Sequence, residues 1–128
     1  MPVLDWDVFA ECLGVLPDPR DRGYPVNFEV ERNGLTLVVS VWPYHNTVNL
    51  TLRRCGAKDP LTSLQLRVHG QVELRKDRAV EYLQIHKADL LPSGFMYEEY
   101  LDSNLIPSIR TYAVVLQVNP DIKIGFER

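Results

Sequence analysis

Residues 26–41 read VNFEVERNGLTLVVSV, and the rest of the predicted sheet is built onto this segment. Apolar and polar side chains alternate on both sides of Asn33-Gly34, a dipeptide that tolerates the positive φ angles of a two-residue hairpin turn. If the chain turns there, each apolar residue meets an apolar partner: Val30 with Leu37, Phe28 with Val39, and Val26 with Val41. A slip of one residue would put the partners on opposite faces, so the pattern predicts an antiparallel hairpin with one apolar face.

The same alternation extends the hairpin into a four-strand antiparallel meander over about residues 26–69. A turn at residues 43–46 places Leu50 of the third strand in phase with the hairpin, and a fourth strand follows a loop that contains Gly56 and Pro60. Matching apolar residues across the last two strands predicts Leu50 opposite Leu66, which would also bring Thr47 opposite His69.

The outward face of this meander is mostly polar. Its side chains are Glu29, Glu31, Thr36, Ser40, Asn49, Thr51, Arg53, Gln65, Arg67 and His69. The simplest interpretation is a solvated face with weak cross-strand ion pairs. Val38 and Trp42 share this face and would suit partial covering or contact with another chain, and the sequence leaves these alternatives open.

The ends of the chain predict two further elements. Trp6, Phe9, Ala10 and Leu13 recur at helical spacing, with Asp5 before them as an N-cap and Gly14 after them as a C-terminal stop. The C-terminal segment, about residues 110–127, alternates again on both sides of Asn119-Pro120-Asp121 and predicts a hairpin with Leu116 opposite Ile124.

Residues 77–91 fit two structures. Asp77 can cap a helix that carries Val80, Leu83 and Leu90, whereas Leu83 and Ile85 between polar residues suit a strand, which we favour. With this segment as a strand, the chain is mainly β: an antiparallel sandwich or open barrel with a short N-terminal helix. The 128 residues predict a single domain, 1–128.

Composition excludes several classes of function. The chain has 14 Lys and Arg against 17 Asp and Glu, a net charge of −3, which argues against binding nucleic acid through its phosphates. The longest mostly apolar run, residues 35–42, is far shorter than the roughly 20 residues of a membrane-spanning helix. The first residues carry Asp5 and Asp7 and no apolar signal segment, so we expect a cytoplasmic protein.

Catalytic and cofactor motifs are missing from the sequence. Neither a phosphate-binding glycine loop nor a nucleophile elbow is present, and no histidine has a second histidine or a cysteine within four positions. We therefore expect no catalytic residues, no metal and no cofactor. Cys12 and Cys55 are expected as buried free thiols, although strand parity points Cys55 toward the polar face. A nucleophilic Cys55 with His45 or His69 is disfavoured, since no base adjoins it in sequence.

Two groups of aromatic and histidine side chains are candidates for binding a ligand or a partner. Trp42, Tyr44, His45 and His69 would gather at one end of the meander, and Tyr97 and Tyr100 interleave with acids in FMYEEYLD, residues 95–102. Both groups also fit ordinary structural roles, as packed, turn or solvated residues and as a short amphipathic helix.

The sequence thus predicts a non-enzymatic protein-interaction or accessory domain that presents a sheet face and aromatic loops. An inhibitor or immunity-type binder that masks a basic partner fits the size and the acidity. The partner is expected to be another protein or a second copy of the chain as a homodimer, and not nucleic acid or a membrane. The alternative is a small-ligand-binding protein or enzyme with its site at the Trp42/His45/His69 end.

Overall fold

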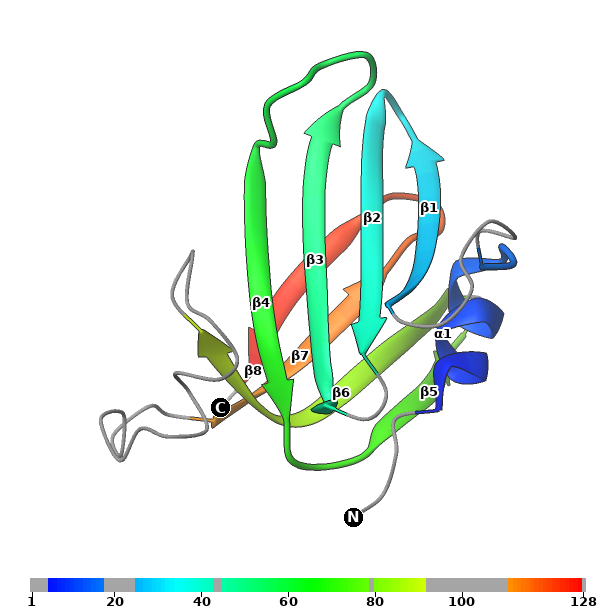
Figure 1. Ribbon diagram of the computed structural model, residues 1–128. Coiled ribbons are helices and arrows are strands. Elements are labelled where there is room, and N and C mark those ends of the chain that lie inside the picture. Colours follow the sequence, from blue (N-terminus) through cyan, green and yellow to red (C-terminus); the bar gives the residue numbers. More distant parts are fainter. Residues whose placement is uncertain (1–4, 18–24, 43–44, 79, 92–110, 128) are drawn as a thin grey trace.

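The computed structural model describes residues 5–17, 25–42, 45–78, 80–91 and 111–127, which hold a helix and eight strands (Figure 1). In chain order the elements are α1 (Trp6–Leu13), β1 (Val26–Arg32), β2 (Leu35–Trp42), β3 (Thr47–Arg54), β4 (Thr62–Val68), β5 (Val72–Asp77), β6 (Val80–Leu91), β7 (Thr111–Gln117) and β8 (Lys123–Glu127). Residues 77–91 are therefore strand apart from the turn that joins β5 to β6.

All eight strands belong to one antiparallel sheet with the order β1-β2-β3-β4-β6-β7-β8, and β5 pairs with β6 beside β4. The sheet bends over on itself, so that β1–β4 form one half and β6–β8 cross behind them (Figure 1). The predicted mainly β fold with a meander, a C-terminal hairpin and a short N-terminal helix is confirmed. The sheet does not close into a barrel, because its two edges, β1 and β8, do not pair with each other.

The registers of three hairpins match the sequence prediction. Val30 lies opposite Leu37, and Val39 lies opposite Leu50. Asn33 and Gly34 both adopt positive φ, 52° and 79°, as the two-residue turn between β1 and β2 requires. In the C-terminal hairpin Leu116 lies opposite Ile124.

The predicted register between β3 and β4 is wrong by two residues. Leu50 lies opposite Leu64 instead of Leu66, and Thr47 lies opposite Arg67 instead of His69. A shift of two residues keeps every apolar side chain on the inner face, so alternation alone cannot distinguish the two registers. The register is set by the loop between β3 and β4. In this loop the Leu61 amide donates to the Leu52 carbonyl at 2.7 Å, so that β4 begins at Thr62.

A bulge in β6 explains why the sequence of residues 77–91 fits both a helix and a strand. The pairing of β6 with β7 shifts between Ile85 and Ala88, and Lys87 adopts a positive φ of 52°. The inserted residue changes the parity, so that Leu83, Ile85 and Ala88 all point inward although their spacing is not a strict period of two. The bend of the sheet lies at the same level, where Gly70 passes so close to β6 that a Cβ atom would lie 2.7 Å from the His86 carbonyl oxygen.

The core lies between the two halves of the sheet. Buried apolar side chains come from both halves, among them Phe28, Leu37, Leu50, Leu83 and Leu116, each 0–1% exposed. Helix α1 packs against β1, β5 and β6 and covers the opening between the halves (Figure 1). Its caps are those predicted, with Asp5 accepting from the Asp7 amide and Gly14 at φ 72°. Within the described residues, α1 is too short to cross a membrane.

Candidate partner-binding face

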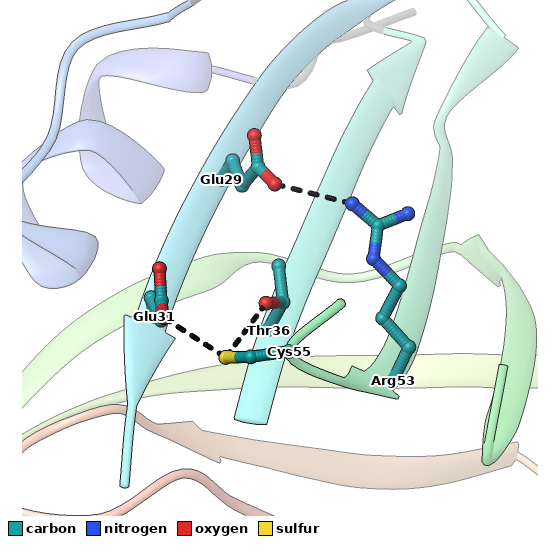
Figure 2. Close-up of polar contacts among 5 residues, drawn as sticks. All are labelled: Glu29, Glu31, Thr36, Arg53 and Cys55. Carbon is teal, nitrogen blue, oxygen red and sulfur yellow. Dashed lines mark hydrogen bonds and ion pairs between the residues drawn. The ribbon is translucent and has the colours of Figure 1, made fainter. Parts of the chain in front are cut away.

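The outer side of the first three strands carries a group of polar side chains that contact one another. We call Glu29, Glu31, Thr36, Arg53 and Cys55 the β1–β3 polar cluster (Figure 2). The strand registers bring them together: Glu31 lies opposite Thr36, and Thr36 lies opposite Arg53. The apolar alternation that builds the core therefore turns these polar residues outward on neighbouring strands.

An ion pair connects the edge strand β1 to β3 across β2. The Arg53 guanidinium donates from Nη2 to Oε1 of Glu29 at 3.2 Å (Figure 2). The Glu29 side chain is 63% exposed and the Arg53 side chain is 38% exposed, so the pair contributes at most about 1 kcal/mol to folding. The pair links the outward side chains of β1 and β3 on the surface.

Cys55 holds the second carboxylate of the cluster. Its thiol donates to Oε1 of Glu31 at 2.9 Å and lies 3.4 Å from the Thr36 hydroxyl (Figure 2). Cys55 is exposed, which corrects the expectation of a buried thiol and agrees with its strand parity. Cys12 is buried as expected, and desolvation, with a smaller effect from the charge of Glu81, raises its pKa to about 11.

A cysteine–histidine pair at Cys55 is excluded by the topology. His69 follows the end of β4 that lies beside Thr47, whereas Cys55 follows the far end of β3. Cys55 lies eight positions beyond Thr47 along extended strand, a distance of about 26 Å. The side chains that contact the thiol are the Glu31 carboxylate and the Thr36 hydroxyl, and neither is a histidine.

The opposite end of the same outer face is covered to a larger extent. Trp42, Thr47, Arg67 and Asp89 lie side by side on β2, β3, β4 and β6. Thr47 is 4% exposed and Asp89 is 6% exposed. At the Cys55 end Glu29, Glu31 and Cys55 are exposed, although Thr36 between them is 6% exposed.

His69 is bound by Asp89, which is not among the site residues predicted from the sequence. The imidazole Nε2 lies 2.7 Å from Oδ2 of Asp89, and the His69 amide donates to the Lys87 carbonyl at 2.9 Å. The signal available in the sequence was a carboxylate inside the apolar run Ala88–Leu91, because such a group needs a polar partner when it is buried.

The other predicted site residues are only partly described. Trp42 is half-buried at the end of β2, and His45 is exposed in the following turn, where its carbonyl accepts from the Thr47 hydroxyl at 3.1 Å. Tyr44, Tyr97 and Tyr100 lie outside the described residues. Among the residues that the structure describes, no group of three or more His, Cys, Asp or Glu side chains could hold a metal ion.

Two open depressions lie on the other half of the sheet. One, of about 560 Å³, is lined by Val115, Gln117 and all five residues of β8. The other, of about 550 Å³, is lined by residues of the β5–β6 turn, β6, β7 and β8, including Tyr82 and Val115. Neither is lined by Trp42, His45 or His69, so the ligand-binding alternative gains no support from them.

Comparison with known proteins gives a likeness in structure alone. No family model matches the chain, and no curated protein matches it in sequence. Among solved structures, a chain of a contact-dependent growth inhibition toxin–immunity protein complex from Klebsiella pneumoniae 342 matches with a TM-score of 0.66. The match covers 99% of this chain and 98% of that chain at 13% sequence identity. The two chains therefore share a fold over their full lengths.

Proposed function

We propose that this protein is an immunity-type inhibitor, which binds a toxin and blocks its activity through the β1–β3 polar cluster. The observation that carries the proposal is the fold shared over 99% of the chain with a member of a toxin–immunity complex. Fold alone does not assign function, so the proposal also needs a surface with suitable chemistry.

The β1–β3 polar cluster supplies that surface. Glu29 and Glu31 project from the same side of the edge strand β1, and each is held by a neighbour, Arg53 or Cys55. Side chains that are already oriented lose less conformational entropy when a partner binds. Two carboxylates with exposed side chains on neighbouring outward positions of β1 suit a partner whose binding surface is basic, as the net charge of −3 also favours.

The arrangement suits inhibition by masking. A protein that acts on an anionic substrate such as a nucleic acid carries Lys and Arg in its active site. Carboxylates placed over such a site would neutralise those charges and prevent the substrate from entering. Electrostatic attraction would also speed association, and the rate would fall as the ionic strength rises.

The experiment that tests this function is capture followed by co-expression. The tagged full chain is used to capture proteins from a lysate of its native host, and each captured protein is then expressed in a bacterium with and without the chain. We expect one captured protein to arrest growth alone and to lose that effect when the chain is present. Captured proteins that arrest growth equally with and without the chain would contradict the proposal.

A further inference from the structure

Strand β8 forms one edge of the sheet and strand β1 forms the other. The two edges differ in the elements that pack against them. The strand order ends at β1 and at β8. Helix α1 packs against β1, whereas within the described residues β8 pairs with β7 alone. An edge strand carries a row of backbone donors and acceptors that can pair with another strand.

One of the two open depressions lies over the last two strands, β7 and β8. Its lining includes every residue of β8, from Lys123 to Glu127. Val115 lies opposite Gly125 and Gln117 lies opposite Lys123, so these lining residues share one face with Glu127, and the hollow lies over that face of β7 and β8. That face is open at Gly125, because a Cβ atom built there would meet no atom within 4 Å.

The sequence of β8, KIGFE, is complementary to itself when two copies run antiparallel. With a two-fold axis at Gly125, Lys123 of each copy lies opposite Glu127 of the other copy. Ile124 of each copy then lies opposite Phe126 of the other copy. We propose that this edge binds a second copy of the chain, so that two β8 strands pair and join two sheets into one across a symmetric dimer interface.

The charges of Lys123 and Glu127 favour the register with the two Gly125 residues opposite each other over registers shifted by two residues. A shift of two residues in either direction would place Gly125 opposite Lys123 or opposite Glu127 and would break both ion pairs. A shift of one residue would put Ile124 and Phe126 on opposite faces from their partners. Phe126 is 46% exposed, and pairing would bury part of its ring against Ile124 of the other copy. A five-residue edge makes a small interface, so we expect a weak, concentration-dependent dimer.

The proposal does not depend on toxin binding, and charge reversal tests it separately. Within the chain Lys123 lies opposite Gln117, and Glu127 lies opposite Ala113, so reversing either charge breaks no cross-strand ion pair inside the monomer. We expect sedimentation velocity, measured from low micromolar to millimolar concentration, to show dimerisation of the natural chain. Lys123→Glu should weaken the dimer by about tenfold or more, and the double variant Lys123→Glu/Glu127→Lys should restore it.

Cross-linking tests the register. In a Cys55→Ser background, Gly125→Cys places two cysteines opposite each other, with Cα atoms about 4.5–5.5 Å apart, which is within disulfide range. We expect this variant to form a disulfide dimer on mild oxidation, whereas Lys123→Cys should do so only when mixed with Glu127→Cys. A chain that stays monomeric at all concentrations, with no Gly125→Cys dimer, would overturn the proposal. Cross-linking of that cysteine to a different polypeptide from a host lysate, without a dimer, would also overturn it and would assign the edge to a partner's strand.

Discussion

The imidazole Nε2 of His69 lies 2.7 Å from the Oδ2 atom of Asp89, joining the end of β4 to the neighbouring strand β6. The Asp89 side chain is only 9% exposed, whereas that of His69 is 41% exposed. A buried carboxylate is stable only when polar partners replace the water it has lost. The pair lies beside the bend at Gly70, so it stabilises the place where the sheet folds over on itself.

Replacing His69 should therefore destabilise the protein. We expect His69→Ala to lower the free energy of unfolding by about 1–3 kcal/mol, because the buried Asp89 carboxylate loses its histidine partner. Urea denaturation measures the change. Gln71→Ala, which truncates an exposed side chain two residues away, is the control and should change stability by less than about 0.5 kcal/mol. Equal effects of the two variants would show that the pair does not stabilise the bend.

Because the backbone at Gly70 passes very close to β6, we expect the methyl group added by Gly70→Ala to destabilise the protein. In Gly70→Ala the new Cβ would lie 2.7 Å from the His86 carbonyl oxygen, so one strand must move. We expect a loss of about 2 kcal/mol or more in thermal or urea unfolding of dilute protein. Gly125→Ala adds the same methyl group where no atom lies within 4 Å and should be nearly neutral. A stable Gly70→Ala variant would mean that the link between β4 and β5 does not pass so close to β6 at Gly70.

Burial of Cys12 predicts a loss of stability at alkaline pH. Burial raises the pKa of this thiol from 9.0 to about 11 in the folded protein, so between these values the unfolded chain releases the proton more readily. The unfolded state then binds fewer protons, and the free energy of unfolding falls as the pH rises from about 9 to about 11, by about 2–3 kcal/mol in all. Urea unfolding of the natural chain and of Cys12→Ala across this range gives the contribution by difference. A constant difference between the two proteins would contradict the assignment.

Part of this structure could be predicted from the sequence because local chemistry determines it. The Asn33-Gly34 turn and strict alternation define the pairing of Val30 with Leu37 and of Val39 with Leu50. The caps Asp5 and Gly14 likewise define α1 from the residues at its ends.

Other parts depend on contacts between distant residues. The two-residue error in the register of β4 leaves every apolar side chain inside, so only the loop before Thr62 reveals it. The bulge near Lys87 breaks the period of two in β6, and no local signal predicts it. The contact of Cys55 with Glu31 joins residues 24 positions apart through three strands, and the sequence showed only that both point outward.

Reversal of the two carboxylates in the β1–β3 polar cluster should weaken the affinity for the captured toxin. Calorimetry should compare the natural chain with Glu29→Arg/Glu31→Arg and with Glu11→Lys/Asp77→Lys, which changes the net charge equally at exposed positions outside this face. We predict that the first variant stays folded and binds at least about 100-fold more weakly, since like charges then meet across the interface, whereas the control binds within a few-fold of the natural chain. Equal affinities of the natural chain and of Glu29→Arg/Glu31→Arg would contradict the proposed binding face.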